Sequence, residues 1–202
     1  MYPHLAPYHV ANFLHLARTG FYDGTRFHRI VPGFVIQGGD PNSRDDDPRN
    51  DGLGGPRARD VLPPDEWEVV ARANQVLAAR GYEGLEGIVH LRAEFSPTVN
   101  HTRGTLSMAR GQDVDSAGSQ FFICVADQPA LDGKYTIFGR VVVGLDAVDR
   151  IVSAEVSPMG QRDAPAVPVQ VIQATVLEGA AALTAAERKA WDALPDGLKD
   201  AR

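Results

Sequence analysis

Cysteine is almost absent from this chain, and Cys124 is the single one among its 202 residues. A disulfide within the chain is therefore excluded. The apolar run FFICV around Cys124 favours a buried, unreactive thiol over a nucleophile. Basic residues are also in the minority, since 20 Lys and Arg stand against 26 Asp and Glu and give a net charge of −6. Because a protein that binds the phosphate backbone needs a basic surface, we expect no nucleic-acid partner.

Long hydrophobic runs are missing as well, and none is long enough to cross a bilayer. The first residues, MYPHLAPYH, lack the charged start and the apolar middle of a secretory signal. We therefore expect a cytoplasmic protein with no membrane partner. The chain length suits one domain with additions better than two large domains.

What the sequence does contain is a series of short apolar segments separated by turn residues. Apolar residues at helical spacing predict helices within 10–17, 63–80, 144–156 and 183–194, and the last begins with the capping-box spacing of Thr184 and Glu187. Runs bounded by Gly, Asp and Ser predict strands within 104–110, 119–125, 134–143 and 167–178. We expect antiparallel β-structure covered by a few helices, as in a barrel or a sandwich.

A long insertion separates the first strands from the later ones. It opens with a polar stretch, 42–60, that has too little apolar content to bury itself and is predicted to be a loop. The helix that follows carries Trp67, Val70 and Leu77 on one face, and we expect this face to pack on the barrel. The same interpretation is given to the C-terminal helix around Trp191.

The segment FHRIVPGFVIQGGDP, at 27–41, predicts a hairpin. Proline presets φ at Pro32, glycine accepts a positive φ at Gly33, and a three-residue connection is favoured over a tight two-residue turn. The resulting register pairs Arg29 with Gln37, Ile30 with Ile36, and Val31 with Val35.

Directly opposed residues in a sheet share one side, so Arg29 and Gln37 become neighbours, with Phe34 free to lie beside them. Taken alone, this face is better explained as a solvated strand surface, because exposed Arg and Gln are common. A second segment, SQFFICV, favours a site. If its residues Phe121 and Ile123 enter the core, then Gln120 and Phe122 face the other way. The two segments would then form a shallow apolar cup rimmed by amides and one positive charge.

Four motifs in this order, FHRIVPGFVIQGGDP, GTLSMAR, AGSQFFICV and LDGKYTIFGRVV, resemble the cyclophilin family of peptidyl-prolyl cis-trans isomerases. The segment APYHVANFLHLARTGFYDG also resembles that family's first helix and the loop after it. The resemblance implies a mainly β fold, a closed eight-stranded antiparallel barrel with capping helices and a peptide groove on its outer surface. It further implies that the substrates are proline-containing polypeptides in unfolded or flexible segments, that the enzyme assists protein folding, and that no metal or organic cofactor is needed.

The resemblance also assigns roles by motif position. The family's catalytic arginine falls on Arg29, and its groove amides fall on Gln37, as a second catalytic residue, and Gln120. The family's other substrate-binding positions fall on Phe34, Val35, Ala109, Arg110, Phe122, Leu131 and Tyr135. In the family, the backbone at the positions of Ala109 and Arg110 holds the residues that precede proline.

These residue types suit rotation about an Xaa-Pro bond. Rotation about a peptide bond costs ~18–20 kcal/mol because of its partial double-bond character, while the two Xaa-Pro isomers are nearly balanced. No bond has to be cleaved, so no nucleophile is required. An apolar cup can hold the ring, and a permanently charged planar guanidinium can stabilise the twisted state in which the nitrogen regains its lone pair.

The sequence departs from the family pattern in three places. Ala130 stands where the family has a large aromatic residue, so we expect weak binding of cyclosporin-type peptides at best. Tyr135 replaces a histidine, and we expect activity to survive because its ring can pack on proline. The chain also begins almost at the first helix, so we expect the family's first two strands to be missing from it. We expect the true start of the protein to lie upstream, and the alternative is that a partner or the insertion fills the gap.

We therefore expect one cyclophilin-like domain at 1–178, with a helical insertion at about 42–94, and a C-terminal helical extension at 179–202. The alternatives are a non-catalytic module that binds proline peptides and a scaffold that acts through the insertion. A calcium site in the acidic stretch is disfavoured, because no glycine stands sixth and no glutamate twelfth from Asp45. His28, His90 and His101 lack ligand spacing, so we expect no metal site.

Overall fold

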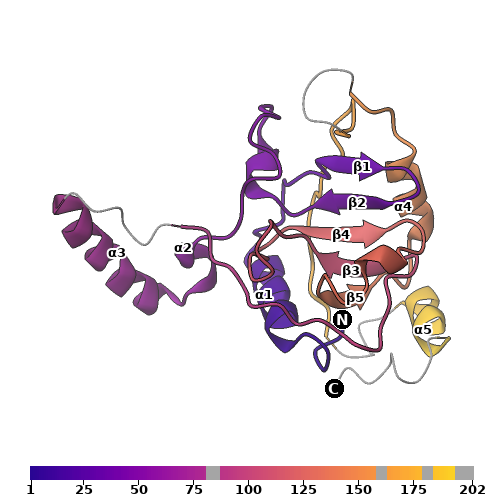
Figure 1. Cartoon of the computed structure of the whole chain (residues 1–202), viewed down its shortest axis with the longest axis horizontal. Coiled ribbons are helices and arrows are strands. Elements are labelled where there is room, and N and C mark those ends of the chain that lie inside the picture. Colours follow the sequence, from indigo (N-terminus) through magenta and orange to yellow (C-terminus); the bar gives the residue numbers. More distant parts are fainter. Residues whose placement is uncertain (81–86, 158–162, 179–183, 194–202) are drawn as a thin grey trace.

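The computed structural model describes residues 1–80, 87–157, 163–178 and 184–193, apart from a few side chains in the helices α3 and α5. Its centre is an antiparallel sheet in the order β1-β2-β4-β3-β5 (Figure 1). The strands are β1 (Arg29–Val31), β2 (Val35–Gly38), β3 (Thr105–Met108), β4 (Phe121–Cys124) and β5 (Ile137–Arg140). All of them lie where the apolar runs of the sequence predict strands.

The predicted hairpin register is confirmed. Arg29 pairs with Gln37, Ile30 with Ile36 and Val31 with Val35. The connection runs from 32 to 34, Gly33 has a φ of +72°, and the Phe34 N–H donates to the Val31 carbonyl at 3.0 Å. Arg29 and Gln37 are therefore held side by side on one face of the sheet.

The edges of the sheet are occupied by single residues from elsewhere in the chain. At β5, the Tyr2 N–H donates to the Phe138 carbonyl at 2.8 Å. At β1, the Ile30 N–H donates to the Asp163 carbonyl at 2.7 Å. These bonds satisfy part of the exposed strand backbone. No pairing of β1 with β5 occurs among the described strands, so the sheet itself is open.

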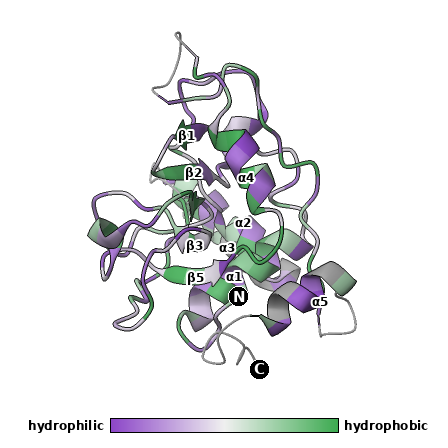
Figure 2. Ribbon diagram, turned by 90° about the vertical axis from the view of Figure 1, so that its right-hand side faces the viewer, coloured by the Kyte–Doolittle hydropathy of each residue, from purple (hydrophilic) through white to green (hydrophobic). Residues whose placement is uncertain are grey.

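The core lies between the sheet and two helices, α1 (Pro7–Arg18) and α4 (Leu145–Val152). In it the Phe13 ring lies 5.6 Å from the Phe121 ring and 5.0 Å from the Phe138 ring. Figure 2 shows hydrophobic residues on β2 and β5, whereas α4 carries hydrophobic and hydrophilic residues on different sides. The apolar side of α4 includes the buried Val148. As predicted, Phe121 and Ile123 of β4 face this core.

Helix α1 begins at a proline and has no capping side chain of its own at Ala6. A distant residue supplies the cap, because the Glu94 carboxylate accepts the N–H groups of Tyr8 at 3.3 Å and His9 at 3.0 Å. A carboxylate at this position satisfies free N–H groups and complements the helix dipole. The end of the insertion is thereby attached to the start of the first helix.

The insertion contains η1 (Pro41–Arg44), α2 (Ala58–Val61) and α3 (Pro64–Ala79), and η2 (Pro129–Leu131) follows later. The prediction that the second helix packs on the barrel is wrong, because α3 extends away from the sheet and joins the rest of the chain through α2 (Figure 1). Accordingly, 68 % of Val69 and 52 % of Val76 are exposed. The side chains of Trp67 and Val70 lie outside the described residues.

The last predicted strand, 167–178, is also wrong as a regular strand. Its only ladder contact is an isolated bridge between Arg26 and Gln170, although the segment pairs with the chain at 24–27 through several backbone hydrogen bonds. The C-terminal helix is confirmed as α5 (Ala185–Asp192), and its capping box forms, with the Thr184 N–H donating to Glu187 at 2.7 Å. Trp191 lies outside the described side chains. No described helix combines the length and the apolar content that crossing a membrane requires.

Candidate active site

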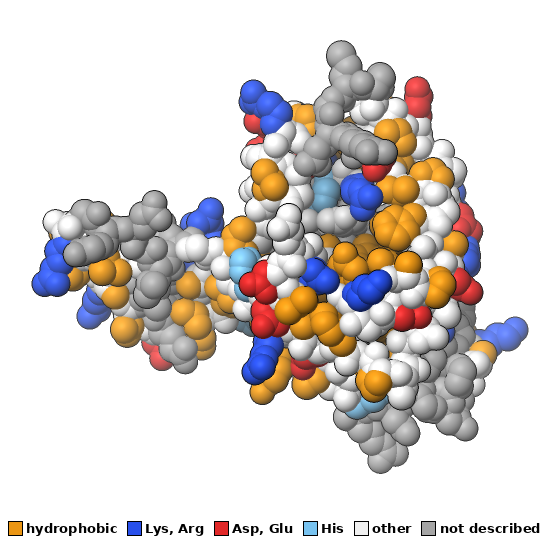
Figure 3. Space-filling model, in the orientation of Figure 1, with side chains coloured by type: hydrophobic (Ala, Val, Ile, Leu, Met, Phe, Trp, Pro, Cys, Tyr) orange, Lys and Arg blue, Asp and Glu red, His pale blue; other side chains and the backbone are white. Residues whose placement is uncertain are grey.

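A cavity of about 170 Å³ opens on the face of the sheet opposite the core. We call it the cup, and it is lined by Arg29, Phe34, Val35, Gln37, Ala109, Arg110, Phe122, Leu131 and Tyr135. These are nine of the ten residues predicted for the site. The tenth, Gln120, lies next to the cup and hydrogen-bonds to Gln37. Figure 3 shows a hollow with hydrophobic side chains in front of β3 and β4, with positively charged side chains beside it.

The floor of the cup is a second, smaller apolar cluster, separate from the main core. It contains Val35 of β2 and both Phe122 and Cys124 of β4, all of them buried. These residues come together because Val35 pairs directly with Cys124 and Phe122 pairs with Gln37. Alternation along β4 thus buries one set of side chains in the core and the other under the cup.

Phe122 is held from two sides by other rings. The Tyr135 ring meets it edge-on at 5.7 Å, and the His101 ring stacks on it at 5.9 Å. Both arrangements are favourable for aromatic pairs. Burial lowers the pKa of His101, and its Nδ1 lies 2.9 Å from the Asp132 carboxylate while its Nε2 lies 3.0 Å from Ser107 Oγ. His101 therefore supports the floor of the cup.

The polar rim of the cup is a chain of side-chain contacts. Arg29 Nη1 donates to Gln37 Oε1 at 3.5 Å, and Gln37 Nε2 donates to Gln120 Oε1 at 3.1 Å. Gln120 Nε2 in turn donates to the Gly54 carbonyl at 2.8 Å. The amides thus connect the arginine to the insertion. Because the Nε2 of Gln37 donates to Gln120, its Oε1 is the atom that faces Arg29.

Arg29 is held in two further ways. Its Nε lies 3.5 Å from the Asp163 carboxylate, and its Cζ lies 5.8 Å from the centre of the Phe34 ring. The side chain is still 36 % exposed, so the guanidinium remains accessible at the cup. Asp163 lies far along the chain from Arg29, and nothing in the local sequence predicts this ion pair.

Arg110 forms the opposite side of the rim. Its Cζ lies 4.7 Å from the centre of the Tyr135 ring, and its Nε and Nη2 donate to the Lys134 carbonyl at 3.2 and 3.0 Å. A guanidinium stacked on a tyrosine face gains a cation–π contribution. Tyr135 therefore provides a surface on which Arg110 rests.

A second cavity of about 300 Å³ adjoins the cup, and we call it the side cavity. It shares Gln37, Ala109 and Arg110 with the cup and extends to Gly54, Gly55, Ile88, His90 and Gln120. Ala109 and Arg110 follow directly after β3, so an extended chain bound in the cup could continue along them.

The cup contains binding groups and no nucleophile. None of its nine lining residues is a Cys, Ser, His or carboxylate residue. Cys124 lies beneath the cup, fully buried, and burial raises the pKa of its thiol to about 12. Among the described residues, no three His, Cys, Asp or Glu side chains are grouped as a metal site. The arrangement suits a reaction that needs an apolar seat and a fixed positive charge.

Comparisons with known proteins identify what this arrangement is similar to. The model of the family described as "Cyclophilin type peptidyl-prolyl cis-trans isomerase/CLD" matches residues 1–176. A probable peptidyl-prolyl cis-trans isomerase of Brucella abortus (strain 2308) is 38 % identical over 174 residues, which are 86 % of this chain and 74 % of the relative. Peptidyl-prolyl cis-trans isomerase B of Bacillus subtilis (strain 168) is 37 % identical over 156 residues, 77 % of this chain and 82 % of the relative.

A solved structure is similar in three dimensions. The crystal structure of a Cryptosporidium parvum cyclophilin-type isomerase, obtained in the presence of the dipeptide Ala-Pro, matches with a TM-score of 0.65 and 25 % sequence identity. The match covers 88 % of this chain and 90 % of that one.

Proposed function

The chain belongs to the family of cyclophilin-type peptidyl-prolyl cis-trans isomerases, and we propose that the cup is where its prolyl substrate is held while Arg29 assists rotation. It has the cyclophilin fold and is an enzyme that interconverts the two isomers of Xaa-Pro bonds. The observation that carries the proposal is the position of Arg29, fixed by Gln37 and Asp163 at the edge of an apolar floor.

In this proposal the cup holds the prolyl ring. Phe122 and Val35 form the base, while Phe34, Leu131 and Tyr135 form the walls. Holding the ring fixes one end of the bond and leaves the preceding carbonyl free to swing. Because the cup is apolar and shallow, it can release either isomer.

Arg29 supplies the electrostatic part of the reaction. In the twisted state the prolyl nitrogen loses conjugation and becomes a hydrogen-bond acceptor, which a fixed guanidinium can stabilise. A donor that is already oriented costs no reorganisation during the step. Gln37 orients Arg29 through its Oε1, and because it also lines the cup, it can touch the substrate as a second catalytic residue.

The residues before proline extend toward the side cavity. We assign the backbone of Ala109 and Arg110 to binding them, together with the side chain of Gln120, because these groups line the side cavity next to the cup. Proline-containing segments of unfolded or flexible proteins fit this open surface. The Ala-Pro dipeptide present with the Cryptosporidium relative supports proline peptides as ligands. We expect weak binding of cyclosporin-type rings at best, because Ala130 is small where the resemblance implies a large aromatic residue.

We also propose that the enzyme assists protein folding and that the chain forms one domain with additions. The family match over 1–176 supports a single domain at 1–178, with the insertion at about 42–94 and an extension at 179–202. The pairing of 24–27 with 169–171 supports closure of the sheet into a barrel at the side of β1.

An NMR titration tests the position of the site. A short Xaa-Pro peptide is added to the labelled protein, and the matching Xaa-Ala peptide serves as the control. We expect shifts and exchange broadening at Phe34, Phe122 and Leu131 with the proline peptide only. Shifts confined to other parts of the chain would refute the assignment of the cup.

A further inference from the structure

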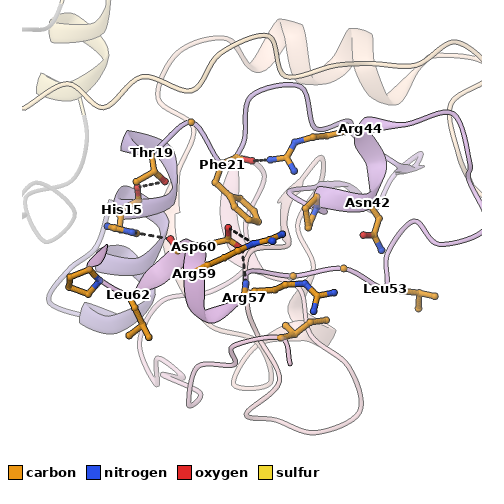
Figure 4. A pocket seen from close by; sticks show the side chains of 16 residues that line it. His15, Thr19, Phe21, Asn42, Arg44, Leu53, Arg57, Arg59, Asp60 and Leu62 are labelled. Atoms are coloured by element: carbon orange, nitrogen blue, oxygen red, sulfur yellow. Dashed lines mark hydrogen bonds and ion pairs between the residues drawn. The ribbon is translucent and has the colours of Figure 1, made fainter. Parts of the chain in front are cut away.

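Histidine side chains join distant segments of this fold, and His101 does so directly against the floor of the cup. His15 of α1, by contrast, lines a cavity of about 840 Å³ between α1, η1 and α2, where its Nε2 lies 3.0 Å from the Asp60 carbonyl (Figure 4). None of the residues that line that cavity also lines the cup. The side chain of His101 has no exposed surface, and its ring stacks on Phe122 with 19° between the two planes. His101 is therefore placed to influence the substrate site.

Two walls of the cup lie on one turn of the chain. Leu131 is the last residue of η2, Tyr135 follows four residues later, and both side chains line the cup. Asp132 lies between them, with its carboxylate 2.9 Å from Nδ1 of His101. We call residues 129–135 the wall turn. Its position relative to the floor determines the width of the cup.

His101 holds this part of the chain by three hydrogen bonds. Its backbone N–H and its Nδ1 both meet Oδ1 of Asp132, at 2.7 and 2.9 Å, and its carbonyl accepts the Gln128 N–H at 2.7 Å. Gln128 in turn donates through its Nε2 to the carbonyl of Gly33, next to Phe34 in the hairpin, at 2.7 Å. The wall turn is thus attached to the floor through His101 and to the hairpin through the residue that precedes it.

The contacts of the His101 ring specify its protonation. The backbone N–H of His101 keeps the pKa of the Asp132 carboxyl below its usual value, and an ionised carboxylate can only accept, so Nδ1 carries the proton. Burial lowers the pKa of His101, so the ring is neutral and its Nε2 accepts from the Ser107 hydroxyl at 3.0 Å. The Ser107 proton is available for this bond, because the nearby Thr136 carbonyl, 2.9 Å from Ser107 Oγ, already accepts the Met108 N–H. The ring is therefore fixed through both nitrogens.

We propose that His101 and Asp132 are a positioning pair for the isomerase reaction, whose hydrogen bond holds the wall turn at the distance from the floor that fits a twisted prolyl ring. This rests on the proposed function, in which the cup holds that ring. Neither residue lines the cup, so both act through Phe122, Leu131 and Tyr135. Without the bond an apolar ring still enters the cup, but it is held in more orientations, and orientation governs how readily the twisted state is reached.

His101→Phe separates the hydrogen bond from the stacked ring. Phenylalanine keeps an aromatic ring against Phe122, whereas the Asp132 carboxylate loses its ring partner and keeps the backbone N–H. We expect kcat for a short Xaa-Pro peptide to fall about fivefold, with KM within about twofold of the wild-type value. A residue that only fills space under the floor would be replaced by phenylalanine without this loss. Urea denaturation shows that the variant is folded under the assay conditions.

Asp132→Asn and the double variant test whether the two residues act through each other. Asparagine replaces a charge-assisted bond with a neutral one, so we expect kcat to fall about threefold in Asp132→Asn. The double variant His101→Phe/Asp132→Asn should lose no more than His101→Phe alone, because both changes affect one bond. Independent actions would instead multiply to a loss of about fifteenfold. Nitrogen-15 NMR of the wild-type His101 ring should show the proton on Nδ1.

Two variants outside the cup are the matched controls. His15→Phe makes the same substitution at the histidine that contacts the Asp60 carbonyl. Asp127→Asn removes a carboxylate that accepts the backbone N–H of Arg103 at 2.8 Å. Both variants should keep the wild-type kcat.

Four results would overturn the inference. They are a wild-type kcat in folded His101→Phe, a loss that appears only in KM, a multiplied loss in the double variant, and a His101 ring with its proton on Nε2. The proposed function fails separately, if turnover of the short peptide does not depend on Arg29.

Discussion

Arg29 is oriented by two groups, one close to it along the chain and one distant. Gln37 approaches from the paired strand β2, and Asp163 approaches from the segment that lies along the edge of β1. The contact with Gln37 could be predicted, because a hairpin register follows from turn length and alternation. The contact with Asp163 could not, because it depends on how the chain returns after α4. For the same reason, the stacking of His101 on Phe122 and the contact of His101 with Asp132 could not be predicted, because both depend on tertiary packing alone.

At the residue scale, the ion pair between Arg29 and Asp163 predicts a positioning role for Asp163. Asp163→Asn keeps the size of the side chain and removes its charge, so Arg29 should be less well fixed in the transition state. Because the pair is partly exposed, we expect kcat to fall about threefold to tenfold with KM unchanged. Steady-state kinetics with an Xaa-Pro peptide measures both constants.

The control for this variant is Asp146→Asn, which removes a carboxylate that pairs with Arg150 on α4, at 2.6 Å, outside the cup. It should leave kcat at the wild-type value. A wild-type kcat in Asp163→Asn, or a loss that appears only in KM, would contradict the positioning role.

At the scale of elements, the polar rim is placed by the hairpin of β1 and β2 and by β4, which pairs with β2. β1 and β2 were predictable in extent, register and turn, because Pro32-Gly33 and the alternating pattern are local signals. The helix α3 was predictable as a helix but not in its placement. Its apolar face favoured packing on the sheet, yet it extends from the body through α2 (Figure 1). Helical periodicity gives the face of a helix and not the partner that covers it.

Two glycines near the hairpin allow the cost of a positive φ to be compared with the cost of a steric clash. Both have positive φ, +72° at Gly33 and +83° at Gly39. A Cβ at Gly33 would meet nothing within 4 Å, whereas one at Gly39 would lie 2.5 Å from the Ser119 carbonyl oxygen. Gly33→Ala should lower the free energy of unfolding by about 1 kcal/mol, and Gly39→Ala by about 3 kcal/mol or more.

Urea denaturation of the two variants measures this difference, and each variant is the control for the other. Equal losses would show that steric contact with Ser119 contributes nothing beyond the φ requirement. Gly33→Ala should also keep most of its isomerase activity, because Arg29 and Gln37 remain paired.

At the scale of the whole molecule, the strands β1 to β5 and the covering helices α1 and α4 could be predicted from the sequence. The segments that meet the edges of the sheet could not. Each edge strand is met by one residue from another segment, Tyr2 at β5 and Asp163 at β1. The segment 167–178 has the alternation of a strand, but it makes only one isolated bridge. Alternation reports which residues could be buried on one face, and the partner strand decides whether a ladder forms.

The buried histidines predict how stability depends on pH. Burial lowers the pKa of His9, His28 and His101 below the ordinary value of about 6.5. The folded state therefore binds fewer protons than the unfolded state, and the free energy of unfolding should fall as pH decreases below about 6.5. Asp51 acts in the opposite sense, since burial raises its pKa to about 6 and its contribution is lost as pH rises through that value, but it is one group against three.

Chemical denaturation at a series of pH values between 7.5 and 5.5 measures this dependence. His28→Phe keeps a ring in the buried position and removes one proton-binding group, so its curve should be flatter than that of the wild type. A wild-type stability that rises as pH decreases over this range would show that the histidines do not dominate.

The most direct measurement is the isomerisation rate of an Xaa-Pro peptide with Arg29→Ala. The variant should fold like the wild type, because Arg29 is part of the rim and not of either apolar cluster. The account predicts that kcat/KM falls about 100-fold, while an exposed arginine change outside the cup, Arg103→Ala, has no effect. A folded Arg29→Ala variant with near-normal kcat/KM would contradict the assignment of this guanidinium to the rotation step.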